Sequence, residues 1–223
     1  MKKSNVLNKQ TTRNILFTVC AIALALASVA ALPKSARADK IIVPPVPDNV
    51  KVTGGKAYLV GHAIGTQNYV CQPSGAGVAY VLFTPQATLF DEDGDKIISH
   101  FFSPNPDPKD PNTDPKVVAD GAIRATWQFR DTSSVWAATV PNGASTDAKF
   151  VEKGAVAWLK LEAKGLQDGP TGGDKLSDNT SFVQRLNTHG GVAPSTGCAS
   201  LADVGNKAFV PYTADYFFYH GGE

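Results

Sequence analysis

Residues 91–95, Asp-Glu-Asp-Gly-Asp, place four carboxylates within five positions. Closely spaced oxygen ligands suit Ca²⁺, so Asp91, Asp93 and Asp95 are candidate metal ligands. An EF-hand loop beginning at Asp91 would need a glutamate at its twelfth position, where this sequence has Phe102. An Asp-Gly pair between two apolar runs is also a hairpin signal. The pattern therefore favours an acidic hairpin turn over a calcium site.

The histidines could supply a general base or a zinc ligand. No two of them are spaced i, i+2 or i, i+4, so a zinc site would have to be assembled from distant segments. His100 and His189 are the better candidates, and either could pair with Asp215 to form a general base. The alternative is that both are half-exposed structural histidines.

Four polar residues lie on a predicted strand that enters a Gly-Gly turn: Gln184, Arg185, Asn187 and Thr188. They could hydrogen-bond a small ligand such as a sugar. Alternatively, Asn187 and Thr188 satisfy the backbone groups of the turn, and Arg185 forms an ion pair with Asp215.

Aromatic side chains form the largest apolar group of the sequence. We expect most of them in the core, with a minority exposed on one face as a carbohydrate platform. The aromatic residues considered are Trp127, Trp136, Trp158, Tyr212, Tyr216, Phe217, Phe218 and Tyr219. The nucleophile-elbow, zinc-protease and Walker motifs are all absent from the sequence.

The first 38 residues read as an export signal. A basic segment precedes an apolar stretch over residues 15–32, and Ala36-Arg37-Ala38 follows as a small-x-small cleavage pattern. An uncleaved membrane anchor is the alternative, because 18 apolar residues can just span a bilayer. Cleavage after Ala38 would expose Asp39 as the new N-terminus.

Removing the leader changes the charge of the chain. The 223-residue sequence has 21 Lys and Arg against 20 Asp and Glu. The leader holds six of the basic residues and none of the acidic ones, which leaves a net charge of −5. Such a chain repels phosphate and anionic lipid, so we expect neither nucleic acid nor membrane as a partner after cleavage.

Two cysteines, Cys71 and Cys198, remain after the leader. An even number in an oxidising compartment favours a disulfide, and two buried free thiols are the alternative.

The elements that would position these groups are predominantly strands. After the leader we expect a proline-rich extended lead-in over 39–50 and a single β domain over 51–223. Turn signals separate apolar runs of short length at near-regular spacing, as in a sandwich or barrel. The predicted strands cover residues 57–63, 67–71, 79–90, 96–102, 123–129, 134–140, 155–163, 181–186 and 212–219. A proline-rich loop is predicted over 103–115, and a weak helix over 200–206.

The C-terminal third carries a long motif. Residues 182–194 read FVQRLNTHGGVAP, Cys198 follows, and residues 210–219 read VPYTADYFFY. This pattern resembles the domain of unknown function 3455 family, secreted proteins of bacteria and fungi. More loosely, residues 65–71, His100 and residues 155–161 also resemble that family.

Two positions depart from the family pattern. Ala157 stands where the family usually has proline, and the connection over 103–120 is longer than usual. The resemblance covers most of residues 44–219 and implies a mainly β fold with a Cys71–Cys198 bridge. It brings no established activity.

Together these features predict an all-β fold, either a sandwich or a distorted barrel of short antiparallel strands with long loops and little helix. We expect a secreted or periplasmic binding or structural module, with no enzymatic activity and no cofactor. A small molecule or glycan is the expected partner. The alternative function is a hydrolase or metal-dependent enzyme that uses His100, His189 and Asp215.

Overall fold

A computed structural model describes residues 40–107, 109–114 and 121–222. The predicted export signal over 1–38 lies outside the described residues. Apart from Lys40, the described residues belong to one compact unit, Ile41–Glu223. Among them, no helix has the length and apolar character needed to cross a membrane.

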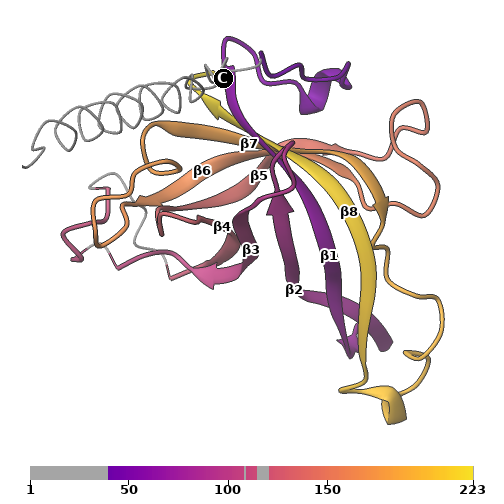
Figure 1. Ribbon diagram of the computed structural model, residues 1–223. Coiled ribbons are helices and arrows are strands. Elements are labelled where there is room, and N and C mark those ends of the chain that lie inside the picture. The colour runs from indigo at the N-terminus through magenta and orange to yellow at the C-terminus, as the bar shows by residue number, and fades with distance from the viewer. Residues whose placement is uncertain (1–39, 108, 115–120, 223) are drawn as a thin grey trace, which may run out of the picture. The chain divides into compact units, whose positions relative to one another are not determined.

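Eight antiparallel strands form a closed barrel in which every strand pairs with its neighbours in the sequence (Figure 1). The strands are β1 (Lys56–Ser74), β2 (Gly77–Phe90), β3 (Lys96–Pro104), β4 (Ile123–Phe129), β5 (Ser134–Ser145), β6 (Trp158–Gln167), β7 (Thr180–Gly190) and β8 (Lys207–His220). Pairing of β1 with β8 closes the barrel. The all-β, antiparallel prediction is confirmed, and closure excludes the sandwich.

The strands are longer than the short runs expected from the sequence, and β1 alone has 19 residues. The sequence predicted a break at Gly65, but β1 continues through it and pairs with β2 and β8 there. A Cβ at position 65 would lie 2.1 Å from the Gln86 carbonyl oxygen. Glycine is therefore present because the β2 backbone approaches closely, and it does not end the strand.

Helical structure is confined to two 3₁₀ turns in the described part of the chain, η1 (Asp48–Val50) and η2 (Leu201–Asp203). The helix predicted over 200–206 is thus reduced to a single turn. Its Ser200 and Asp203 satisfy each other's backbone N–H groups in a capping box.

The apolar residues form two separate clusters, one on each face of the sheet. The inner cluster fills part of the barrel and includes Leu89, Ile98, Trp127, Val135, Val183, Tyr216 and Phe218. The outer cluster lies against β6, β7 and β8 and includes Val50, Trp158, Phe182, Leu186, Phe217 and Tyr219. Both faces of these three strands are therefore apolar.

The lead-in before β1 covers the outer cluster. Ile41, Val43 and Val46 pack against it, and Val50 is fully buried in it. The Gln184 side chain, 1% exposed, donates from Nε2 to the Val50 carbonyl oxygen at 2.6 Å and accepts from the Tyr219 hydroxyl. These bonds hold the lead-in on the outside of the barrel.

A disulfide joins Cys71 in β1 to Cys198 in the β7–β8 connection, 127 residues apart. Two backbone hydrogen bonds also join β1 to the β7–β8 connection beside the disulfide. Cys71 N donates to the Asn206 oxygen at 2.8 Å, and Gly205 N donates to the Cys71 oxygen at 2.9 Å. The predicted disulfide is confirmed.

Candidate functional site in the barrel interior

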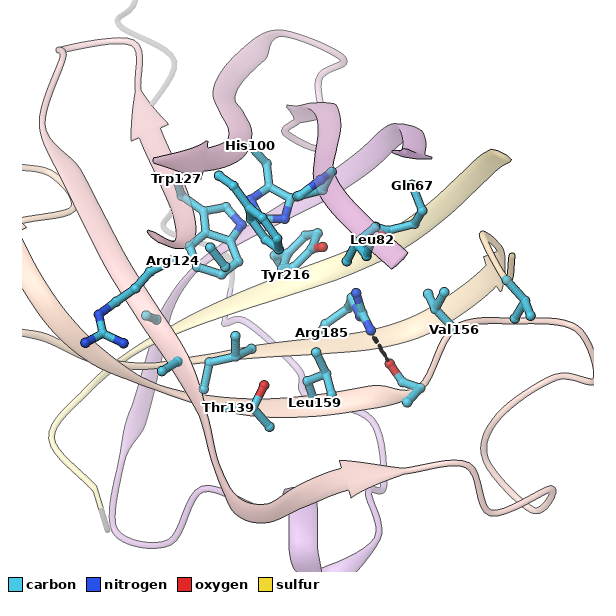
Figure 2. Close-up of a pocket in the computed structure, with 18 of the residues that line it drawn as sticks. Gln67, Leu82, His100, Arg124, Trp127, Thr139, Val156, Leu159, Arg185 and Tyr216 are labelled. Atoms are coloured by element: carbon cyan, nitrogen blue, oxygen red, sulfur yellow. Dashed lines mark hydrogen bonds between the residues drawn. The ribbon is translucent and has the colours of Figure 1, made fainter. Parts of the chain in front are cut away.

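A cavity of about 650 Å³ occupies the part of the barrel interior that the inner cluster leaves unfilled. On β3 the lining includes His100, while Ile98 is core. On β8 the lining includes Tyr216, which lies between the core residues Ala214 and Phe218. Core side chains thus fill part of the interior and border the cavity. Figure 2 shows side chains from several strands converging on this space.

Small side chains account for the free volume. An eight-stranded barrel is just wide enough for its side chains to fill it or for one small ligand to bind. The alanines that line the cavity are Ala125, Ala137, Ala138, Ala155, Ala157 and Ala193. Ile123 and Val192, which also line it, are 69% and 46% exposed. The cavity therefore opens to solvent past an apolar rim.

Aromatic rings form the floor of the cavity. The His100 and Trp127 rings are stacked at 4.4 Å with an angle of 8° between their planes. The Tyr216 ring lies 5.0 Å from His100 and 5.4 Å from Trp127. The three labelled side chains lie together in Figure 2. They provide an aromatic surface that also carries the ring nitrogens of His100, the Trp127 Nε1 atom and the Tyr216 hydroxyl.

His100 is held in its neutral form. Burial lowers the pKa of His100 to about 3, the Thr126 carbonyl opposes this shift, and the nearby charge of Arg185 adds to it. The neutral ring donates from Nδ1 to the Thr126 oxygen at 2.8 Å, so Nε2 is an acceptor. The chemistry available here is hydrogen bonding by a neutral imidazole.

Arg185 brings a positive charge into the same space. Its Nε and Nη2 both donate to the Ala157 carbonyl oxygen, at 3.1 and 2.9 Å (Figure 2). The predicted ion pair with Asp215 is wrong. Arg185 pairs with inward-facing Tyr216, while Asp215 pairs with Leu186 of the outer cluster. Successive strand residues face opposite sides, so the two charges lie on opposite faces of the sheet.

Two buried donors in the lining have no hydrogen-bond partner among the described residues. They are Gln67 Nε2 and Trp127 Nε1, on side chains that are each 1% exposed. Buried polar atoms are nearly always paired, so unpaired ones in a cavity wall call for an explanation.

The other predicted ligand-binding residues have partners within the chain. Gln184 lies on the outer face and binds the lead-in. Asn187 donates from Nδ2 to Asp215 Oδ2 at 2.7 Å, and Thr188 donates to the Val156 oxygen at 2.6 Å. Of the four, Arg185 lines the cavity.

The structure does not bring together His100, His189 and Asp215, the candidates for catalysis. His100 is inside the barrel. His189 is exposed and bonded to Glu152. Asp215 is on the outer face, where its Oδ1 lies 2.7 Å from His62 Nδ1.

Asp215 contacts His62, a histidine that no sequence pattern singled out. Its Nε2 lies 3.1 Å from Glu92 Oε1, so both ring nitrogens face carboxylates. Burial alone would lower the pKa of His62, but the hydrogen bonds to Asp215 and Glu92 raise it above the ordinary value. A ring with both nitrogens engaged has no lone pair for a general base.

The candidate metal ligands lie in the hairpin turn between β2 and β3. The Asp91 carboxylate accepts from the backbone N–H groups of Asp93 and Asp95, at 3.2 and 2.9 Å. The hairpin prediction is confirmed. Within the described ranges, no three His, Cys, Asp or Glu side chains are grouped so as to hold a metal ion.

The eight aromatic residues considered for a carbohydrate platform are all buried, the most exposed being Trp136 at 7%. Seven of them divide between the inner and the outer cluster, while Trp136 belongs to neither and donates from Nε1 to Ser103 Oγ at 2.7 Å. A flat sugar-binding face built from them is therefore absent.

Gln67, Trp127 and Tyr216 line the cavity but were not among the predicted site residues. A signal was available for the first. Gln67, Tyr69 and Cys71 are two residues apart, so they share one face of β1, and a glutamine among such neighbours is unusual.

Fold and cavity together define this chain as a closed, antiparallel eight-stranded β-barrel with a cavity in its interior. The profile of the family described as "Protein of unknown function (DUF3455)" matches residues 52–220. The chain belongs to this family. Comparison of this chain with the curated proteins and with the solved structures found no match.

Proposed function

We propose that this protein is an exported binding module that takes one small, largely apolar molecule into its barrel. The observation that carries the proposal is the cavity of about 650 Å³, which falls within the range of ligand pockets. Its lining is mostly alanine, aliphatic and aromatic, with a few convergent polar groups, as is typical of small-molecule sites. Moving the apolar surface of a ligand from water into such a space is favourable, so the cavity favours an apolar ligand.

Export is part of the proposal. The leader over 1–38 has the layout of a signal peptide, and the Cys71–Cys198 disulfide fits an oxidising compartment such as the periplasm or medium. Intact-mass measurement of the secreted protein should give a chain beginning at Asp39. A retained leader would contradict cleavage.

Binding is tested with N-phenyl-1-naphthylamine, a neutral probe that fluoresces in apolar surroundings. We expect saturable binding of one probe per chain. Displacement by 1-decanol would show that the site takes an aliphatic chain as well.

A matched pair of variants locates the probe. Ala137→Phe places a ring inside the cavity and should weaken probe binding about tenfold or more, because the added volume competes for the same space. Ala144→Phe lies on the same strand at an exposed position outside the lining and should bind like wild type.

Circular dichroism checks that each variant is folded. If Ala137→Phe is unfolded, Ala125→Phe replaces it, because this partner residue on β4 lines the same cavity. Equal weakening by the inner and outer variants, or no probe binding by wild type, would refute the proposal.

A further inference from the structure

The charged side chains among the described residues that line the cavity are both cationic. Two arginines, Arg124 and Arg185, line it, and none of the described lining residues is Asp or Glu. Arg124 donates from Nε to Asn105 Oδ1 at 3.0 Å. Arg185 lies beside Tyr216 of the aromatic floor (Figure 2). A cation in an apolar space is costly unless an opposite charge accompanies it.

Arg185 retains donors for another group. A guanidinium carries five N–H donors in a planar fork. Two of them bond the Ala157 carbonyl oxygen, a further hydrogen bond joins the side chain to Tyr216, and no carboxylate pairs with it among the described residues. These bonds fix the orientation of the side chain and leave the rest of its donors for a ligand.

The neighbouring polar atoms add further donors. Gln67 Nε2 and Trp127 Nε1 are buried, line the same cavity and lack partners in the described part of the chain. Neutral His100 contributes no competing positive charge. Three side chains from β1, β4 and β7 thus offer unpaired N–H groups, which suit an acceptor with several oxygen lone pairs.

The field of Arg185 extends across the floor. Burial raises the pKa of Tyr216, and the Arg185 charge opposes this shift. The same charge acts to lower the pKa of His100 on the other side of the floor. A negative group placed here would therefore be stabilised at several positions.

We propose that the apolar ligand of this barrel carries a carboxylate, which binds the Arg185 guanidinium while the apolar body lies against the alanine-rich wall. This inference rests on the proposed function. A monoanionic carboxylate matches the single charge of Arg185 and the fork of donors that its guanidinium presents. The ligand class is thus a medium-chain or aromatic carboxylic acid.

The test compares two ligands with the same ten-carbon chain, decanoic acid and 1-decanol, by displacement of N-phenyl-1-naphthylamine at pH 7.4. Wild type should bind the acid about tenfold or more tightly than the alcohol, since a charge-assisted hydrogen-bonded pair adds to the same apolar contact. Equal affinities would overturn the carboxylate inference and leave the proposed function standing. Failure of the probe and of both ligands to bind would refute the proposed function itself.

Variants assign the preference to one residue. Arg185→Met keeps the aliphatic length and removes the charge, so it should reduce acid affinity about tenfold and change alcohol affinity less than about threefold. Arg130→Met removes an exposed arginine outside the lining and should leave both affinities unchanged. A preference for the acid that survives in Arg185→Met would overturn the inference.

A second measurement needs no variant, in case Arg185→Met fails to fold. The ¹³C carboxyl resonance of labelled decanoic acid is followed in the complex as the pH is lowered to 5. Contact with Arg185 predicts that the bound group stays ionised at pH 5. Protonation at a higher pH than in free solution would place the carboxyl away from the charge and overturn the inference.

Discussion

Folding lowers the pKa of His100 within a pH range in which protein stability can be measured. Its pKa in the folded chain is about 3 against an ordinary value of 6.5, chiefly because burial disfavours the charged ring. Below pH 6.5 the unfolded chain binds a proton that the folded chain refuses, so stability falls as the pH falls. Above pH 6.5 both states are neutral at this position and the effect vanishes.

Replacing His100 therefore changes the acid limb of the stability curve. His100→Asn retains an N–H donor for the Thr126 carbonyl and removes the titration. Each pH unit below 6.5 lowers the free energy of unfolding of wild type by on the order of 1 kcal/mol. Between pH 6.5 and 4, the free energy of unfolding of wild type should therefore fall by about 3 kcal/mol more than that of the variant. Urea denaturation at a series of pH values measures both slopes, and the carboxylates common to both proteins cancel in the difference. Parallel acid limbs would contradict the buried, neutral state of His100.

Sequence alone could select Arg185 but could not give its environment. Strict alternation along β7 separates Gln184 from Arg185 onto opposite faces, and this much was predictable. Both faces of β7 are apolar, however, as Val183 on the inside and Phe182 and Leu186 on the outside illustrate. Nothing local therefore tells which face encloses a cavity. The predicted ion pair between Arg185 and Asp215 was wrong for the same reason. The β7–β8 register decides whether the two side chains share a face of the sheet, and this register is known only from the structure.

At the scale of elements, the longest strand depends on one close backbone approach. Gly65 of β1 faces Gln86 and Ala87 of β2, and a Cβ there would lie 2.5 Å from the Ala87 Cα atom. Gly65→Ala should force β1 and β2 apart and lower the free energy of unfolding by about 1–3 kcal/mol. Gly77→Ala is the matched control, because a Cβ at position 77 has nothing within 4 Å. Chemical denaturation of the two variants compares them directly, and equal stabilities would show that β2 tolerates a side chain at position 65.

The disulfide ties the β7–β8 connection to the far end of β1. Closing a 127-residue loop removes entropy from the unfolded chain, so the double variant Cys71→Ala, Cys198→Ala should be less stable by about 3–5 kcal/mol. Wild type in excess reductant should match the double variant. A reductant effect that persists in the double variant would assign the change to something other than this bridge. The backbone bonds beside the bridge should keep the barrel folded at moderate temperature.

Most of the strands were predictable from the sequence, but the closure of the sheet into a barrel was not. Period-two runs and turn residues located the hairpin at residues 91–95, the turn after β1 and most strands. Glycine at position 65 reads locally as a break, yet the tertiary contact with β2 is what requires it. Choosing between sandwich and barrel depends on whether β1 meets β8, and that pairing joins positions more than 140 residues apart, such as His62 and Asp215.

For the whole molecule, the two faces of one sheet serve different purposes. The outer cluster is sealed by the lead-in through Val50 and Gln184, so the barrel gains a second core outside its wall. The interior is then free to remain partly unfilled, with core side chains bordering the cavity. An unfilled interior costs stability, and the outer cluster adds buried apolar side chains on the other face of the sheet.

Ligand binding inside the barrel can be seen directly in a crystal structure of the protein with 10-bromo-1-decanol, recorded at the bromine absorption edge. Anomalous difference density locates the ligand without assumptions about its contacts. A ligand held in the cavity should give one bromine peak inside the barrel, in the space bounded by Ala137, Leu159 and Trp127. A peak confined to the outer surface, or side chains that fill the interior and leave no space for the ligand, would contradict binding inside the barrel.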